Sequence, residues 1–219
     1  VYRGFDEAIY LFVLLPLITS FAYSWTVCYD RSSGYITQVI SRTNRKKYFL
    51  AKYIVSFISG GIIFAASVIF HFLLISMFLP AQYPVAAVGT SFVSPFSFCS
   101  ELYYSSPYIF LLVWTFTAFL WGGAMVCIAI GIGMITKRYS ISVILPFLIF
   151  TVQRIISDFI TLRYSILIHG KTVGLSWSDM LYAAPGTTNF ASYVYTNIAI
   201  VIAVPTLVFA IRGRKYECL

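Results

Sequence analysis

Five long, apolar and almost uncharged runs constrain the fold of this sequence more than any other feature. The runs cover 8–28, 53–79, 108–135, 140–156 and 191–211. A helix needs about 20 apolar residues to cross the hydrocarbon core of a bilayer, so the runs predict five transmembrane helices. Only 10% of the residues are charged and 60% are apolar, against about 25% and about 45–50% in soluble domains. We therefore expect an all-α, polytopic membrane protein, which excludes a water-soluble domain and a disordered chain.

Basic residues are distributed unevenly among the segments between the runs. The loop 29–52, the turn 137–138 and the tail 212–219 carry 11 basic and 2 acidic residues, a net charge of +9. All other segments together carry 4 basic and 5 acidic residues, which leaves the total at +8. Because Lys and Arg accumulate on the cytoplasmic side of membrane proteins, we expect a multi-pass protein of the cell membrane. Its 29–52 loop and its C-terminus would be cytoplasmic, and the segments 81–107 and 161–190 external.

This topology places the N-terminus outside. The sequence begins with Val1 and shows no signal peptide, so something upstream would have to carry that end across the membrane. We expect residues 1–219 to form a single transmembrane domain that lacks an N-terminal first helix, with six spans in the parent protein.

The segment before the last run contains an amphipathic, aromatic stretch at 175–182. Two alternatives stay open for it. It is a re-entrant segment in the outer leaflet, which requires a helical or protein-covered backbone, or it is an ordinary surface loop.

The basic loop after the first run predicts a short helix over 33–41. Ser32 or Ser33 can cap its start through a side-chain oxygen. Three apolar side chains then follow at helical spacing on one face: Ile36, Val39 and Ile40. A helix this short is not stable alone and needs a surface to lie on. That surface is either lipid, with the basic residues 42–47 as an anchor for anionic headgroups, or a groove on a cytoplasmic partner.

The same loop resembles the first cytoplasmic loop of ABC-2 type permeases, the membrane subunits of ABC exporters. The resemblance lies in the acidic residue, small residues and glycine of 30–34, in Ser41-Arg42, and in Arg45 and Lys52. Asp30 departs from the family, which more often has Glu there. The resemblance implies that the short helix couples the chain to an ATPase, through residues Asp30, Ser33, Gly34, Ile36, Val39, Ile40, Arg42 and Arg45.

The family further implies two permease subunits, as a homo- or heterodimer, and separate cytoplasmic ATPase subunits that bind ATP and Mg. The sequence has no Gly-x-x-x-x-Gly-Lys-[Ser/Thr] loop to hold ATP, so we expect a non-enzymatic subunit without a cofactor of its own. Its partners would be those subunits and membrane lipids, not nucleic acid. The expected cargo is a hydrophobic or amphipathic peptide, drug or lipid.

The second run carries a narrow stripe of small or polar residues: Ser56, Gly60, Ser67 and His71. At about 100° per residue these positions share one helix face. Such a stripe either packs closely against a neighbouring helix or lines a substrate path, and an intramembrane histidine is a candidate for the second use.

Two other classes of membrane protein compete with the permease. One is a component without transport activity, such as a sensor or an assembly scaffold. The other is a lipid-modifying enzyme, which the sequence disfavours because it has no His-Glu-x-x-His motif and no pair of intramembrane carboxylates.

Overall fold

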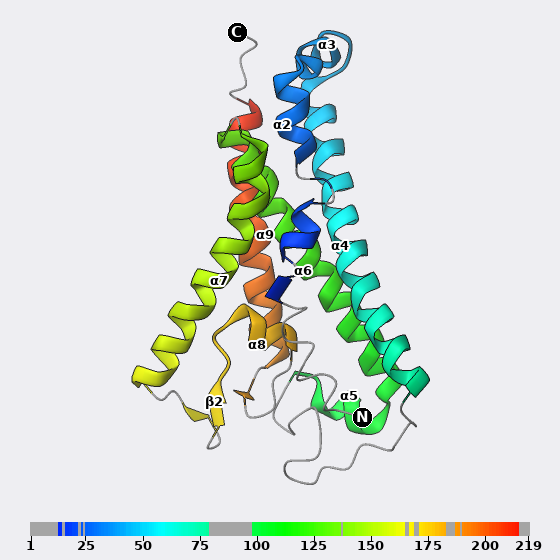
Figure 1. Cartoon of the computed structure of the whole chain (residues 1–219), viewed down its shortest axis with the longest axis vertical. Coiled ribbons are helices and arrows are strands. Elements are labelled where there is room, and N and C mark those ends of the chain that lie inside the picture. Colours follow the sequence, from blue (N-terminus) through cyan, green and yellow to red (C-terminus); the bar gives the residue numbers. More distant parts are fainter. Residues whose placement is uncertain are drawn as a thin grey trace. The chain divides into compact units, whose positions relative to one another are not determined.

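The computed structural model describes residues 13–14, 16–21, 23, 25–78, 98–136, 138–164, 167–168, 171–182, 187–188 and 190–214. Helices dominate these residues (Figure 1). The elements are α2 (Trp25–Ser32), α3 (Tyr35–Arg42), α4 (Arg45–Phe78), α5 (Ser100–Ser105), α6 (Pro107–Ile135), α7 (Tyr139–Tyr164), β1 (Leu167–Ile168), β2 (Lys171–Val173), α8 (Trp177–Tyr182), β3 (Thr187–Thr188) and α9 (Ala191–Arg214).

Four of the described helices, α4, α6, α7 and α9, are long and apolar enough to cross a membrane. The most apolar stretch of α6 is 78% buried, whereas those of α4, α7 and α9 are 17–28% buried. The latter three helices therefore expose large apolar side chains, such as Phe70, Ile155 and Ile200, which is typical of a lipid-facing surface. The predicted helical, multi-pass class is confirmed, with four candidate spans among the described residues. In the fifth expected span, 8–28, the described residues 13–14, 16–21, 23 and 25–28 are helical, and the other positions lie outside the described residues.

Two of the spans are longer than hydropathy predicts. α4 begins at Arg45 instead of residue 53, because Asn44 caps it: the Lys46 backbone N–H donates to Asn44 Oδ1 at 3.0 Å. Its 34 residues measure about 51 Å at 1.5 Å per residue, well over the roughly 30 Å of hydrocarbon. α7 continues to Tyr164 instead of ending near residue 156. The basic residues 45–47 thus lie in a helix and not in a loop.

The described residues form two compact units, and the division falls inside α4, α6, α7 and α9. The second unit takes its residues from Leu15–Phe64, Phe119–Leu148 and Ile198–Leu219. Its core is a cluster of buried apolar side chains from α2, α4, α6 and α9: Val27, Phe49, Val126, Ile130, Met134 and Phe209. Gly60 of α4 and Gly122 of α6 bring two backbones together in this unit, since a Cβ on Gly122 would lie 2.5 Å from the Gly60 carbonyl oxygen.

The first unit takes its described residues from 13–14, Ala65–Ala118 and Ile149–Asn197. Aromatic contacts fill its core, among them an edge-to-face pair of Phe98 and Tyr195 with centroids 5.9 Å apart. The predicted external segment 161–190 contains a small sheet in the order β1-β2-β3. β1 pairs with β2 in antiparallel orientation, and β2 pairs with β3 in parallel orientation. This sheet was not expected.

Candidate coupling site at the start of α4

The second unit contains a helical hairpin formed by α2 and α3 (Figure 1). Gly34 reverses the chain between them with a left-handed φ of 72°, a conformation that costs glycine little and other residues more. The prediction that Ser32 or Ser33 caps the short helix is wrong. Both hydroxyls instead donate back to the Tyr29 carbonyl oxygen, at 3.0 and 2.9 Å, and so terminate α2.

The apolar face of α3 lies against the chain itself. Ile36 is only 1% exposed, and Ile40 packs on the core cluster of the second unit. Val39 is half-buried. The short helix exists where its spacing predicts it, but the expectation that Ile36 anchors in a partner's groove is corrected, because the fold already buries that side chain.

Asp30 joins the end of α2 to the first turns of α4. Its Oδ2 atom lies 2.6 Å from the Lys52 ammonium, and the two side chains are 13% and 12% exposed. The same oxygen accepts a hydrogen bond of 2.7 Å from the Tyr48 hydroxyl. Lys52 Nζ also lies 5.0 Å from the centre of the Tyr23 ring, a cation–π arrangement. Asp30 is therefore an internal tie, and not the water-exposed contact that its place in the loop suggests.

Arg31 ties α2 to a different helix. Its Nη1 donates to the Met134 carbonyl oxygen at 3.4 Å, in the last turn of α6. Carbonyl groups there lack partners within the helix and attract cations. Neighbouring residues of one short helix thus hold α4 on one side and α6 on the other.

The outward side of the hairpin is polar and aromatic. Tyr29, Ser33, Tyr35 and Gln38 line a shallow cavity of about 390 Å³, with Asp30 among its walls. Tyr35 is 50% exposed, and Gln38 stands on the side of α3 opposite to Ile36 and Ile40. We name these four lining residues, without Asp30, the outer face of the hairpin.

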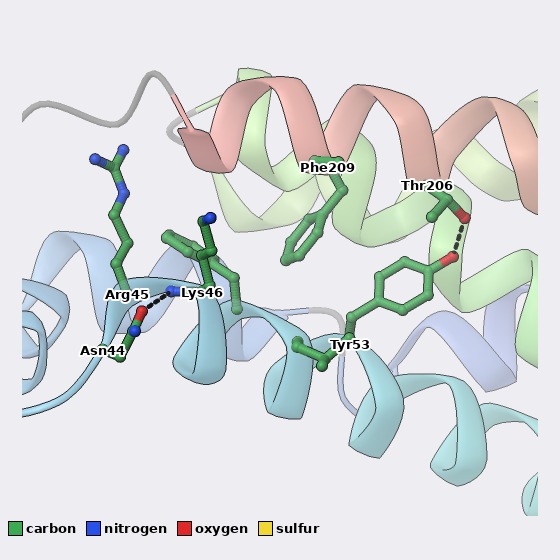
Figure 2. A pocket seen from close by; sticks show the side chains of 9 residues that line it. Asn44, Arg45, Lys46, Tyr53, Thr206 and Phe209 are labelled. Atoms are coloured by element: carbon green, nitrogen blue, oxygen red, sulfur yellow. Dashed lines mark hydrogen bonds between the residues drawn. The ribbon is translucent and has the colours of Figure 1, made fainter.

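The remaining basic residues of the predicted coupling set follow α3. Arg42 is exposed at the end of α3, and Arg45 opens α4. Arg45 also lines a second cavity of about 570 Å³, which lies between the first turns of α4 and the last turns of α9 (Figure 2). No pattern in the sequence indicates this cavity, since its two walls are over 150 residues apart.

The predicted polar stripe of α4 divides into two pairs. Ser56 is fully buried and donates to the Lys52 carbonyl oxygen at 2.7 Å, and Gly60 lies against α6. These two residues pack a helix contact, and their use in a substrate path stays a prediction. Ser67 and His71, in the first unit, are half-buried, and their use in a path stays a prediction.

A side-chain clamp in the first unit holds the stretch 175–182 on α7. Gln153 donates to the Leu175 carbonyl oxygen at 3.0 Å and accepts from the Trp177 backbone N–H at 3.1 Å. Arg154 and Asp158, four residues apart on α7, form an ion pair at 3.9 Å. Across the residues that the structure describes, no group of three or more His, Cys, Asp or Glu side chains is placed to hold a metal ion.

Together the fold and the site define a multi-pass, α-helical membrane protein with a braced helical hairpin before its 34-residue span. Neither a family model, nor a curated protein, nor a solved structure matches the chain.

Proposed function

We propose that this chain is the permease subunit of an ATP-driven exporter of the ABC-2 type, which moves a hydrophobic or amphipathic substrate out across the cell membrane. The outer face of the α2–α3 hairpin is the docking surface for a cytoplasmic ATPase subunit. The chain does not hydrolyse ATP itself, and it works with a second permease subunit.

One observation carries the proposal beyond sequence resemblance. The hairpin combines an exposed aromatic and polar surface with rigid attachment to two long helices, through Asp30 to Lys52 and through Arg31 to Met134. A coupling element needs both properties, because a partner must find a surface to bind and its movement must reach the spans. A hairpin that served only as a lipid anchor would need neither tie.

The test is recovery of an ATPase subunit with the full-length chain from its native membranes, in two matched double variants. Tyr35→Asp with Gln38→Asp places two charges in the outer face. Thr37→Asp with Ser41→Asp places two charges on exposed positions of the same helix that do not line its cavity. Loss of a buried aromatic contact costs about 2 kcal/mol or more in a typical interface, so the first variant should bind the ATPase at least about 30-fold more weakly.

The result must separate three outcomes. Loss of ATPase and transport in the Tyr35–Gln38 variant alone supports the proposal. Equal loss in both variants would mean a general effect of charge and would remove the outer face as the docking surface. Purification of the wild-type chain with no nucleotide-hydrolysing subunit would contradict the exporter and favour the sensor or scaffold.

A further inference from the structure

The cavity between α4 and α9 has one apolar part and one cationic end. Phe49, Tyr53 and Phe209 supply aromatic surface, with the Phe49 and Phe209 rings 5.7 Å apart and the Tyr53 and Phe209 rings 5.4 Å apart. Arg45 and Lys46 stand at the other end (Figure 2). Its volume of about 570 Å³ is within the roughly 300–1,000 Å³ of ordinary ligand sites.

Polar and apolar chemistry are separated along the length of the cavity. The Tyr53 hydroxyl is hydrogen-bonded to the Thr206 hydroxyl, so that end offers mainly ring surface. From Arg45 to Tyr53 the helix rises about 12 Å. A ligand that fills this length needs a negatively charged group at one end and an apolar body behind it.

The cationic end gathers several basic residues, and the start of the helix adds positive charge of its own. The first turn of α4, which the structure describes in full, contains Arg45, Lys46 and Lys47 and no acidic residue. A helix N-terminus carries about half a positive charge, so cations are unfavourable there and anions are stabilised. An anion beside Arg45 and Lys46 would compensate both sources of positive charge.

The location identifies the source of this ligand. Both walls belong to candidate membrane spans, α4 and α9, and exposed apolar residues, Leu50 and Ala210, line the cavity as well. A molecule in the bilayer therefore reaches the apolar part directly, while the basic first turn meets the headgroup region. We infer that this cavity binds an anionic phospholipid, with its phosphate at Arg45 and Lys46 and an acyl chain against Phe49, Tyr53 and Phe209.

The experiment measures binding of dioleoylphosphatidylglycerol to the purified full-length chain in detergent, by native mass spectrometry and by the shift of the unfolding temperature. Lys46→Gln and Lys47→Gln form the matched pair: both side chains are exposed neighbours of equal charge, and only Lys46 lines the cavity. One basic residue near an anionic lipid contributes about a factor of 5 in affinity. We expect about that loss for Lys46→Gln and less than a twofold loss for Lys47→Gln. Ala210→Trp, which fills the apolar part and keeps every charge, should also abolish tight binding.

Four outcomes would overturn the inference. Equal losses in the two lysine variants would show diffuse attraction to the basic turn. Equal stabilisation by dioleoylphosphatidylcholine would show that the net negative charge of the lipid is unnecessary. Equal stabilisation by inorganic phosphate would show that the acyl chains are unnecessary. Unchanged binding in Ala210→Trp would show that no acyl chain occupies the cavity.

Discussion

Replacing Asp30 by alanine tests the tie between α2 and α4 directly. The variant removes the carboxylate that faces the Lys52 ammonium at 2.6 Å and the Tyr48 hydroxyl at 2.7 Å. It leaves an ammonium group that is 12% exposed without its counter-charge. Breaking a buried ion pair from one side costs about 3–5 kcal/mol. Since this pair keeps some contact with water, we expect the lower end, a loss of about 3 kcal/mol in the free energy of unfolding.

Equilibrium unfolding of the full-length chain in mixed micelles, with increasing sodium dodecyl sulfate, measures this loss. Asp30→Asn serves as a control that keeps an oxygen for Tyr48 and removes only the charge, so its loss should be smaller. Lys52→Met removes the ammonium and keeps an apolar chain of similar length. The double variant Asp30→Ala with Lys52→Met should be more stable than the sum of the single losses predicts, by about 2 kcal/mol.

A loss below about 0.5 kcal/mol in Asp30→Ala would refute the reasoning, because that value is typical of water-exposed ion pairs. Strictly additive losses in the double variant would refute it too. Either result would mean that the carboxylate and the ammonium do not interact in the folded chain, and α2 would then have no electrostatic tie to α4.

Two further predictions concern helix packing and pH. Gly60→Ala should destabilise the chain by about 1–3 kcal/mol, because its new methyl group would collide with Val126. Gly131→Ala, whose methyl group would find its nearest neighbour at 3.5 Å, should change stability by less than 1 kcal/mol in the same unfolding assay. Burial, followed by the nearby Asp158 carboxylate, raises the pKa of Asp179 to about 6, so the stability that the neutral carboxyl contributes is complete near pH 4 and lost as pH rises through about 6. Asp179→Asn should therefore raise the unfolding temperature at pH 7.5 and leave it nearly unchanged at pH 4, and an equal effect at both values would contradict this.

The sequence was sufficient for features that depend on local pattern. Apolar runs predict the spans α4, α6, α7 and α9, because a bilayer accepts few alternatives to a helix. The spacing of Ile36, Val39 and Ile40 predicts α3, since a helix with one apolar face must cover it. The small residues Gly60 and Ser56 indicate either close contact with a neighbouring helix or the lining of a substrate path. In the structure Gly60 lies against α6 and Ser56 is fully buried.

Other features of the site depend on contacts between distant parts of the chain. A periodic apolar face shows that Ile36 is covered, but the pattern is the same whether a partner or the chain itself covers it. Asp30 and Lys52 meet only because Gly34 reverses the chain between them. Both residues belong to the stretch that resembles the permease loop, so the resemblance did single them out. Their pairing could not be predicted, because residue spacing alone does not show how the loop 29–52 folds back on itself. The start of α4 was missed because three consecutive cations lower hydropathy without lowering helix propensity.

The two ties of α2 limit how a docked partner could act on this chain. Displacing the α2–α3 hairpin away from α4 would require Asp30 to leave Lys52, at a cost of about 3 kcal/mol by the estimate above, and would also uncover Ile36 and Ile40. Moving the hairpin together with the first turns of α4 keeps the contact of Asp30 with Lys52 and the cover of Ile36, and gives up only the hydrogen bond of 3.4 Å from Arg31 to Met134 of α6. The movement of lowest energy is therefore a rigid displacement of α2, α3 and the first turns of α4 as one body. If the chain couples to an ATPase as proposed, Asp30 would be the link that transmits force in that movement, and Lys52→Met should uncouple ATP hydrolysis from transport before it reduces binding of the ATPase.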